Sequence, residues 1–584
     1  MELKSSKDSA TESFPTDSSM SRSTAIIALF LTSALGFFLR IINISSFNIY
    51  PDSYIYLLMA KNMIAGSPVE YLGPHGMFYK LQFFWITRLG YLLLIVPFNL
   101  IFRDLEFSAH VVSFLAAILS VPLIYLLASK LFDSRQAGII SSFLLAISFT
   151  HVAWSGFVLA ETTAIFFILT SLVFTAYSIR RESSDFGNLH DILAGIFAAL
   201  SVITRCEYLL LILPLLFLVV VDSKYYWGKV VTFLSSFFVL LTAITLATPF
   251  MREQFGIAPN VFNSNSAFFV ASIVLPLFLA VLIKQQAAWA KETLSILRKI
   301  VAVLIPGFIA YVYVQLIFGD RMLPYWSRTL AATRIFAQYE FLIVIVGVLG
   351  ISYLLLSQEH SNIGFFALLY VLPPAVLYNR VNPTSYRYSI NHLPVLIIAG
   401  SFLVAKLAKL IKSKLQKSPP KLQWLAVYAT LSLTVFVSLL QIKTSAASMT
   451  EWVSEVSYEK KAAIKVAKII EDKNIPKDTV LITFFFESYY IYTNKSTGGV
   501  YTEYPYLPMD DFPSNKPILI VVDEGLRDQR PGFVKFVEKN LSRFVIDKFW
   551  VGIPYYLEDY RKEESKPVTL YYISGKKFTN ILGF

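Results

Sequence analysis

Long apolar runs separated by short basic segments constrain the fold of this chain more than any other feature. Of its 584 residues, 55% are hydrophobic and only 15% are charged, and the mean hydropathy is +0.58. In a soluble domain of this size, roughly a quarter of all residues are charged. Because hydrocarbon offers the backbone no hydrogen-bond partners, such runs cross a bilayer as helices. The composition therefore predicts a polytopic α-helical membrane protein.

The hydropathy pattern predicts about thirteen transmembrane helices. They are expected at residues 23–42, 108–129, 137–153, 162–179, 191–204, 207–221, 229–248, 267–283, 300–318, 341–356, 363–379, 391–408 and 422–442. The stretch 83–102 is interrupted by Arg88 and is expected to be an interfacial helix rather than a span. The stretch 192–221 carries Arg205 and Glu207 at its middle and is expected to form two short helices with these charges at the tip.

Lysine and arginine positions predict which side each loop occupies. The loops assigned to the cytoplasm are basic and contain Lys130, Arg135, Arg180, Arg181, Lys224, Lys229, Lys284, Lys291, Arg298, Lys299, Lys406, Lys409, Lys412, Lys414, Lys417 and Lys421. This bias follows the positive-inside rule. Since these basic residues are spread over short loops, the net charge of +12 does not indicate a nucleic-acid partner.

The opposite side has a different chemistry. After the first outer loop, its connections contain no lysine but carry Arg205, Arg252, Arg321, Arg328, Arg334, Arg380 and Arg387. The planar guanidinium fork binds phosphate in a bidentate way, so this rim suggests a phosphate-bearing ligand. The alternative is that these arginines anchor helix ends at the membrane interface.

The chain is expected to divide into three parts. Residues 1–22 are predicted to be a disordered cytoplasmic N-terminus, and residues 23–444 a membrane domain whose first outer loop spans 43–107. Residues 445–584 are charged and aromatic. In this last part, helices at 459–472 and 533–540 alternate with strands at 479–486, 517–523 and 568–573. This pattern predicts a three-layer α/β domain, which the odd number of spans places outside the cytoplasm.

Two carboxylates are the candidate catalytic residues. Asp52 lies in the first outer loop, before a helical run at 53–65, and Glu161 follows the third span. Each has a structural alternative, because Asp is a favoured helix N-cap and a carboxylate is favoured in a first helical turn. On one membrane face, two carboxylates can divide the work of deprotonating an attacking hydroxyl and binding the acceptor or a divalent cation. Whether a metal takes part stays open, since neither Glu70 nor His75 nor His151 shows the spacing of a metal site.

A third element opens a late helix from the outer side. The segment 383–394 contains Tyr386, Arg387 and Tyr388 followed by Asn391. An arginine at a helix start, beside tyrosines and free amides, can bind a phosphate. We therefore expect Arg387 and Tyr388, together with Arg205, to contact a donor phosphate; an aromatic and basic interface belt is the alternative.

Together these elements resemble the GT-C superfamily of lipid-phosphate-sugar glycosyltransferases, in the ArnT-like or protein O-mannosyltransferase branch (family 39). The matching stretches are 52–66, 130–144, 155–161, 194–205 and 386–394. The resemblance implies a catalytic role for Asp52 and a donor-phosphate contact for Arg387. Ser53 and Glu161 depart from the residues that many members carry, and the oligosaccharyltransferase signature Trp-Trp-Asp-Tyr-Gly is absent.

The resemblance implies an inverting transferase in the cell membrane. It is expected to move one sugar, a hexose such as mannose or a pentose, from a polyprenyl- or dolichyl-phosphate donor to a hydroxyl of a protein, lipid or glycan on the outer face. The alternative is a transporter or lipid flippase with an outer binding domain. Transporters place ionisable groups near the midplane, often in two related halves, whereas this chain shows no internal repeat. A glycan-binding receptor is a third hypothesis, which would leave the pairing of Asp52 with Glu161 unexplained.

Overall fold

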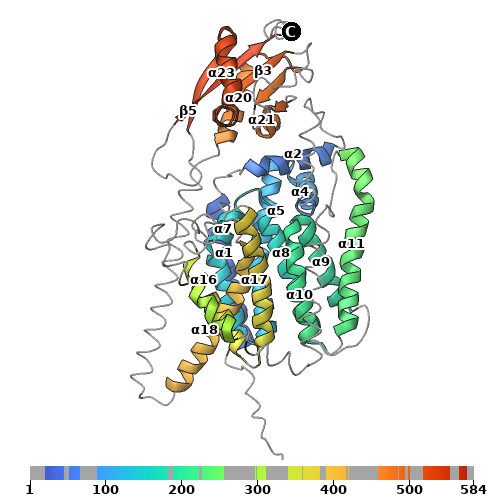
Figure 1. Cartoon of the computed structure of the whole chain (residues 1–584), viewed down its shortest axis with the longest axis vertical. Helices are drawn as coiled ribbons and strands as arrows, with labels where there is room; N and C mark the ends of the chain where they lie inside the picture. Colours follow the sequence, from blue (N-terminus) through green and yellow to red (C-terminus); the bar gives the residue numbers. More distant parts are fainter. Residues whose placement is uncertain are drawn as a thin grey trace, which may run out of the picture.

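A computed structural model of the whole chain places a helical bundle beneath a small α/β unit (Figure 1). The structure describes residues 20–44, 51–65, 88–181, 188–222, 226–255, 296, 299–308, 310, 340–357, 359–381, 390–415, 419, 458–483, 486–493, 497–499, 517–552 and 565–574. The predicted N-terminal disorder at 1–19, the predicted spans at 267–283 and 422–442, and the candidate residues Arg387 and Tyr388 lie outside the described residues.

The bundle consists of apolar helices joined by short connections. Its elements are α1 (Arg22–Ile44), α2 (Pro51–Ala65), α4 (Leu89–Phe102), α5 (Leu105–Phe132), α6 (Arg135–Ile147), α7 (Phe149–Ser155), α8 (Glu161–Ile179), α9 (Leu189–Thr204), the 3₁₀ turn η1 (Cys206–Tyr208), α10 (Leu209–Asp222), α11 (Tyr226–Phe255), α16 (Phe341–Leu356), α17 (Ser361–Val381) and α18 (Leu393–Leu415). Helices α5, α8, α9 and α11 pack in a row, while α1 and α18 pack against α6, and α16 against α18.

The predicted spans fall on described helices, wholly or in part, except for the two segments named above. Within the described residues, five helices are long and apolar enough to cross a membrane, and a sixth span exists if α6 and α7, bent by 55°, count as one. Several other apolar helices are shorter, among them α4, α9 and α10. The chain is therefore a multi-pass helical protein, and the total of about thirteen spans stays a prediction.

Two of the basic segments, around Arg135 and Arg180, lie at one end of the bundle. Arg180, which follows α8, donates from Nη2 to the carbonyl oxygen of Leu131 near the end of α5, at 2.8 Å. Arg135, at the start of α6, donates from Nη1 to the carbonyl oxygen of Met20 before α1, at 2.9 Å. Because α8 begins at Glu161, that carboxylate lies at the opposite end. The bundle thus has one basic end and one end that carries the candidate site.

Helices α16 and α18 approach so closely that only glycine fits at the contact. A Cβ at Gly347 would lie 2.7 Å from the carbonyl oxygen of Leu396, and one at Gly350 would overlap the carbonyl of Ala399. Small residues let membrane helices pack backbone to backbone, where dispersion and close contact provide the association energy.

Gly350→Ala is therefore expected to lower the free energy of unfolding by about 1–3 kcal/mol, because the added methyl group forces α16 and α18 apart. Thermal unfolding of the detergent-solubilised protein measures the effect. Gly307→Ala is the matched control, since a Cβ there meets nothing within 4 Å. Equal midpoints for the two variants would contradict the tight α16–α18 contact.

The α/β unit is built on a five-stranded sheet in the order β2-β1-β3-β5-β4. Its strands are β1 (Val480–Thr483), β2 (Thr497–Gly499), β3 (Ile518–Val522), β4 (Val545–Gly552) and β5 (Ser565–Ile573), and its helices are α20 (Tyr458–Asp472), α21 (Phe486–Thr493), α22 (Glu524–Gln529) and α23 (Pro531–Asn540). Strands β2, β1 and β3 run parallel, whereas β5 is antiparallel to β3 and β4.

Apolar side chains on both faces of this sheet produce the expected three layers. Leu519 and Val521 of β3 pack with α20 on one face, while Ile518, Ile520 and Val522 pack with α23 on the other. Successive strand residues point to opposite faces, so a run of five apolar residues is typical of a strand covered on both sides. All five residues of β3 are buried.

The predicted strand at 479–486 is too long at its C-terminal end. The strand ends at Thr483, and Phe486 instead begins α21, a helix that the sequence analysis missed together with α22, β2 and β4. An aromatic run such as 484–486 suits a strand or a buried helix equally well, so periodicity could not separate them.

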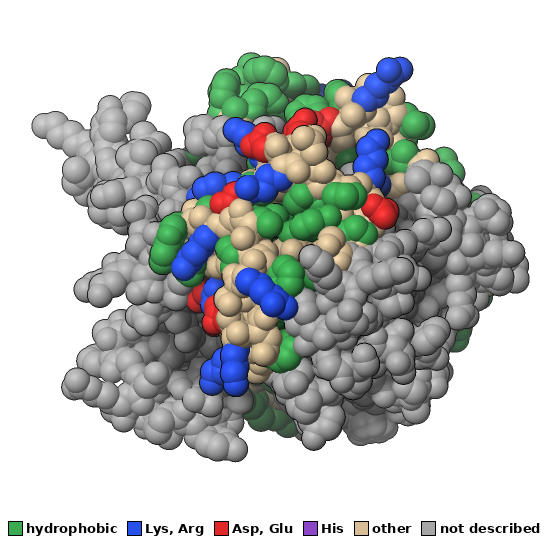
Figure 2. All heavy atoms as spheres, turned by 90° about the horizontal axis from the view of Figure 1, so that it is seen from above, with side chains coloured by type: hydrophobic (Ala, Val, Ile, Leu, Met, Phe, Trp, Pro, Cys, Tyr) green, Lys and Arg blue, Asp and Glu red, His purple; other side chains and the backbone are tan. Residues whose placement is uncertain are grey.

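The outward face of the α/β unit carries charges of both signs (Figure 2). On this face, described Lys and Arg side chains lie beside Asp and Glu and surround a small apolar area. Nucleic-acid surfaces concentrate positive charge on one face. The visible arrangement is that of a solvated surface.

The buried carboxyl of Asp523 makes the stability of the α/β unit depend on pH. It follows β3, accepts hydrogen bonds from the Leu526 amide and the Tyr489 hydroxyl, both at 2.9 Å, and is fully buried. Burial raises its pKa from 3.8 to about 6. Between these values the folded protein binds more protons than the unfolded chain, so the free energy of unfolding falls as the pH rises.

Asp523→Asn is expected to remove this pH dependence, because asparagine keeps the helix cap and carries no proton to release. At 1.36 kcal/mol per pKa unit, the wild type should lose about 3 kcal/mol between about pH 4 and pH 7, and the variant should not. Thermal unfolding of the full-length protein at several pH values measures this. The control is Asp528→Asn, a substitution at an exposed residue. If the stability of wild type and Asp523→Asn changed with pH in parallel, the pH dependence would not come from Asp523.

Candidate active site

Helix α2 carries Asp52 to the end of the bundle that faces the α/β unit (Figure 1). It begins at Pro51, a residue preorganised for the first helical position, so Asp52 lies in the first turn rather than at the N-cap. Residues Tyr54 and Tyr56–Ala60 are almost fully buried. The helix is therefore enclosed by neighbours on several sides, with α4 and α5 on one side and α21 on another.

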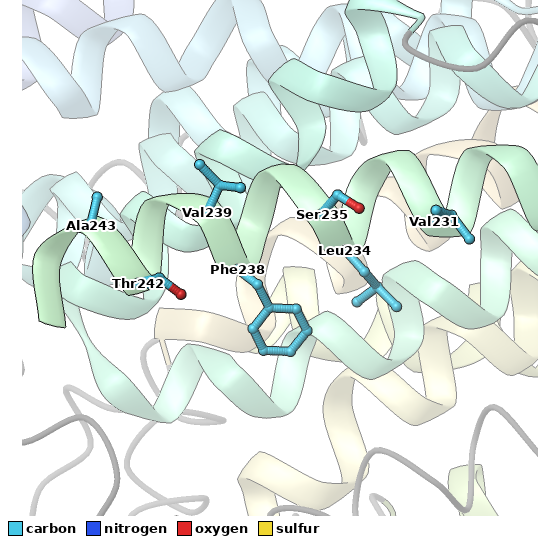
Figure 3. A pocket seen from close by; sticks show the side chains of 7 residues that line it. All are labelled: Val231, Leu234, Ser235, Phe238, Val239, Thr242 and Ala243. Atoms are coloured by element: carbon cyan, nitrogen blue, oxygen red, sulfur yellow. The ribbon is translucent and has the colours of Figure 1, made fainter. Parts of the chain in front are cut away.

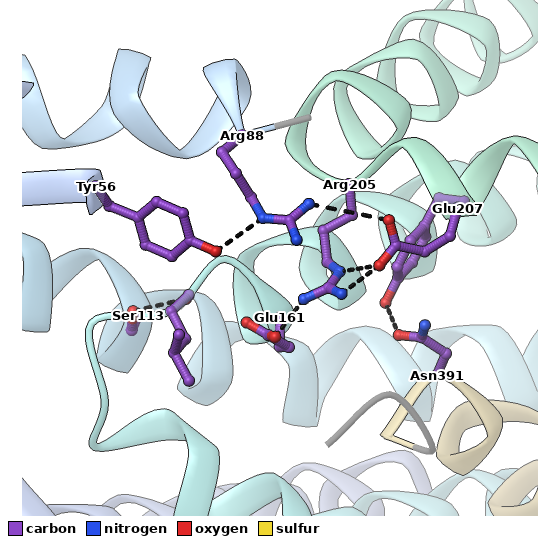
Figure 4. A network of polar contacts seen from close by, with 9 residues as sticks. Tyr56, Arg88, Ser113, Glu161, Arg205, Glu207 and Asn391 are labelled. Atoms are coloured by element: carbon purple, nitrogen blue, oxygen red, sulfur yellow. Dashed lines mark hydrogen bonds and ion pairs between the residues drawn. The ribbon is translucent and has the colours of Figure 1, made fainter. Parts of the chain in front are cut away.

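Arg205 is the centre of a buried charge network near α2 (Figure 4). It ends α9 and forms ion pairs with Glu161 at the start of α8 and with Glu207 in η1. Its Nε also donates to Glu207 Oε1 at 2.5 Å. The side chains of Arg205 and Glu161 are each 1% exposed. Two spans thus meet at one guanidinium, which both carboxylates hold in a fixed orientation.

Arg88 connects this network to α2. As the residue before α4, it donates from Nε to the hydroxyl of Tyr56 at 2.9 Å, and its Nη1 lies 3.9 Å from Glu207 Oε2. Its guanidinium also lies 5.9 Å from the centroid of the Tyr56 ring. Tyr56 packs edge-on against Tyr91, with ring centroids 5.9 Å apart. Asp52 precedes Tyr56 by four residues, so one helical turn, about 6 Å, separates the backbone of Asp52 from this contact.

The start of α18 is attached to the same cluster. The hydroxyl of Tyr208, in η1, donates to Asn391 Oδ1, and Asn391 is 1% exposed. Asn391 belongs to the segment 383–394, and Arg387 stands four residues before it in the sequence. The hydrogen bond ties the end of that segment to the turn that also holds Glu207.

Two guanidinium groups and two carboxylates give the described cluster no net formal charge. Glu207 lies between Arg205 and Arg88, and both positive charges favour its ionised form. Charges this well buried are retained only when paired. Such a cluster can stabilise a developing negative charge if the ligand approaches the arginine side.

His151 does not belong to this cluster. Its Nδ1 lies 2.6 Å from Arg40 Nη2, and Arg40 also donates to the carbonyl oxygens of Leu145 and Ala146 at the end of α6. On the other side of the bend, Glu340 accepts from the Thr150 amide at 2.7 Å. These contacts stabilise the bend between α6 and α7. Arg40 places a positive charge at the C-terminus of α6 and Glu340 a negative charge at the N-terminus of α7, and both positions are favourable for the helix dipoles.

Among the described residues, no three His, Cys, Asp or Glu side chains come together as metal ligands. Glu161 and Glu207, the carboxylates of the cluster, bind Arg205 instead. Glu70 and His75 lie outside the described residues. The involvement of a divalent metal ion therefore stays open.

A shallow groove of about 640 Å³ runs along α11, away from the charged cluster (Figure 3). Its lining consists of Val231, Leu234, Ser235, Phe238, Val239, Thr242 and Ala243. Since all seven residues come from one helix and none is charged, the groove offers no charged group to a phosphate.

The structure brings together part of the predicted site. Glu161 and Arg205 form an ion pair, and Asp52 starts the helix whose Tyr56 contacts Arg88. Arg88 and Glu207 were noted in the sequence as interruptions of apolar stretches but not as site residues. An ionisable residue inside a membrane segment is a functional candidate by default, and that signal identifies both.

A family comparison covers this cluster. Residues 85–251 match the family model described as dolichyl-phosphate-mannose-protein mannosyltransferase. That region contains Arg88, Glu161, Arg205 and Glu207. No curated protein matches the sequence.

The fold is similar to that of a solved archaeal oligosaccharyltransferase. The oligosaccharyltransferase AglB from Archaeoglobus fulgidus, in complex with an inhibitory peptide and a dolichol-phosphate, superposes with a TM-score of 0.56 at 13% identity, over 95% of this chain and 74% of that one. The A. fulgidus enzyme tethered to an acceptor peptide gives 0.55 at 13% identity, over 91% and 73%. ArnT from Cupriavidus metallidurans bound to undecaprenyl phosphate gives 0.49 at 11% identity, over 94% and 98%.

Residues 85–251 are thus similar to a mannosyltransferase family, and the whole chain is similar in fold to a solved oligosaccharyltransferase. The matched family is described as a mannosyltransferase family, which agrees with the resemblance noted in the sequence. The rival hypothesis of a transporter or flippase receives no support from these comparisons.

Proposed function

We propose that this protein is a GT-C glycosyltransferase, which transfers a single sugar from a polyprenyl- or dolichyl-phosphate donor to an acceptor hydroxyl at the outer face of the membrane. The observation that carries the proposal is the buried cluster of Arg88 and Arg205 at the end of the bundle where α2 and the α/β unit meet. Two rigid guanidinium groups at one place match the geometry of a phosphate.

In this mechanism, Asp52 is the general base. It takes the proton of the acceptor hydroxyl while the oxygen attacks the anomeric carbon from the face opposite the phosphate. The bond from the anomeric carbon to the phosphate oxygen breaks, and its electron pair leaves with the lipid phosphate. Attack from the opposite face inverts the configuration of the sugar.

The arginines stabilise the leaving group. Arg88 and Arg205 would face the phosphate as its negative charge grows, and Arg387 with Tyr388 would complete the contact from the start of α18. Glu161 and Glu207 would keep Arg205 in place, which removes the cost of orienting it during the reaction. Glu161 is thus proposed to act through Arg205 rather than on the acceptor.

The family match favours mannose as the sugar and a protein as the acceptor. The α/β unit lies over the same end of the bundle as the cluster and is placed to contact a large acceptor (Figure 1). The basic end of the bundle would face the cytoplasm, as the positive-inside rule requires.

A transfer assay tests this proposal. Proteoliposomes that contain the full-length protein, given radiolabelled dolichyl-phosphate mannose and a membrane-protein extract as acceptor, are expected to release lipid phosphate and to label the acceptor in equal amounts. Uptake of label into sealed vesicles without release of lipid phosphate would contradict the proposal and support a transporter.

A further inference from the structure

One short helix of the α/β unit contacts the membrane bundle beside the candidate site. Helix α21 begins three residues after the end of β1 and packs against α2, the helix that starts beside Asp52 (Figure 1). No other element of the sheet unit has such a contact with α2 in the part of the chain that the structure describes. The α21–α2 contact therefore links the two parts of the molecule at the candidate site.

Tyr492, near the end of α21, makes two contacts with the bundle. Its hydroxyl donates to Glu106 Oε2, in the first turn of α5, at 2.9 Å. Its ring packs edge-on against Tyr54 of α2, with centroids 6.3 Å apart and planes at 80°. Lys460 of α20 forms an ion pair with the same Glu106. One carboxylate of the bundle thus holds two helices of the α/β unit.

Helix α21 is also fixed to the sheet. Tyr489 is fully buried, and its hydroxyl donates a hydrogen bond to Asp523 Oδ2 at 2.9 Å. Burial and the Glu106 carboxylate raise the pKa of Tyr492, so its hydroxyl keeps its proton and remains a donor at physiological pH. Helix α21 is accordingly a rigid spacer, with one tyrosine bound to the sheet and another bound to the bundle.

Helix α2 is held from both sides by these contacts. Tyr54 meets Tyr492 of the α/β unit, whereas Tyr56 meets Arg88 of the charged cluster. Both tyrosines stand within four residues of Asp52. A shift of α2 by about 1 Å would move a general base on this helix out of position. A misplacement of this size strongly lowers the rate of a catalysed reaction.

We propose that Tyr492, bound to Glu106, is a positioning residue that holds α2, and with it Asp52, in the orientation needed for transfer. The proposal rests on the proposed function. It assigns the α/β unit a mechanical role in catalysis, in addition to any contact with the acceptor. Because Tyr492 touches neither donor nor acceptor in this account, its loss should affect the turnover number and leave donor binding nearly unchanged.

Steady-state transfer by full-length variants in proteoliposomes tests this. Tyr492→Phe removes the hydrogen bond to an ionised carboxylate and is expected to lower kcat about tenfold, with the donor KM within about twofold of wild type. Tyr492→Ala also removes the ring from Tyr54 and should lower kcat further. Tyr572→Phe, in β5 of the same unit, is the matched control and should leave both constants unchanged.

A pair of substitutions at Glu106 separates positioning from misfolding. Glu106→Lys, which offers Tyr492 no acceptor, is expected to lower kcat, whereas Glu106→Gln keeps a side-chain carbonyl that can accept from Tyr492 and should retain most of it. Hydrogen exchange of the α2 amides, which needs no activity, should be faster in Tyr492→Ala than in wild type. Wild-type kcat in both Tyr492 variants, or unchanged exchange in α2, would overturn the proposal.

The two possible failures are distinguishable. If the wild type transfers no sugar, the proposed function fails, while the exchange of the α2 amides still decides whether α21 holds α2. If the wild type is active and Tyr492→Ala is indistinguishable from it, the transferase stands and the positioning role is wrong.

Discussion

Asp52→Asn is expected to lower the rate of sugar transfer by about 10²–10⁴-fold, the range that general-base catalysis contributes. Asparagine is nearly the same size as aspartate and is equally favoured at the start of a helix, so α2 should fold as in the wild type. It cannot accept a proton from the acceptor hydroxyl. The donor KM should change little, because the phosphate is bound by arginines on other elements.

The measurement is the release of polyprenyl phosphate per protein, with thermal unfolding recorded on the same preparation. Asp133→Asn is the matched control: Asp133 lies at the basic end of the bundle with φ of 50°, a left-handed conformation that asparagine also adopts. Undiminished transfer by Asp52→Asn would remove this residue from the mechanism.

Arg205→Met should affect both stability and activity. Methionine fills much of the arginine volume but leaves the carboxylate of Glu161 buried without its ion pair, and a change of this kind costs about 3–5 kcal/mol. We expect a large drop in the unfolding temperature and no measurable transfer. Arg135→Met, at an exposed arginine of the basic end, should change stability by no more than about 0.5 kcal/mol.

A second substitution separates the two effects of Arg205. In Arg205→Met/Glu161→Gln, no uncompensated charge remains at Glu161, while Glu207 keeps Arg88 as its partner. The double variant should regain most of the lost stability and still transfer no sugar. Recovery of transfer along with stability would show that Arg205 serves the fold alone.

Much of the membrane architecture could be predicted because burial in lipid leaves few solutions. Apolar runs of span length must be helices, and loop charges then order them; the break of 192–221 at Arg205 followed from the same reasoning and is confirmed by the end of α9 at Thr204. In the α/β unit, the strands at 517–523 and 568–573 coincide with β3 and β5. The strand predicted to reach 486 was wrong at its end, since local pattern does not separate an aromatic strand end from a short helix.

Some residues of the candidate site were predicted singly, but their contacts were not. Asp52, Glu161 and Arg205 stood out because ionisable groups in or next to apolar segments are costly unless they have a purpose. In the sequence, Arg88 is only an interruption of an apolar stretch. In the fold, it lies between Tyr56 and Glu207 and contacts both. Likewise, nothing in the local sequence around Glu106 indicates that Tyr492, 386 residues away, donates a hydrogen bond to it.

The sequence by itself determined that this chain is a multi-pass helical protein with an α/β unit after the bundle, because hydropathy and periodicity are local properties. Only the tertiary structure decided which charges neutralise one another, and that the α/β unit rests on the helix that begins beside Asp52. Ion pairs and helix contacts depend on distances between segments far apart along the chain. Those distances are set by how all the helices pack together, which no single stretch of sequence contains.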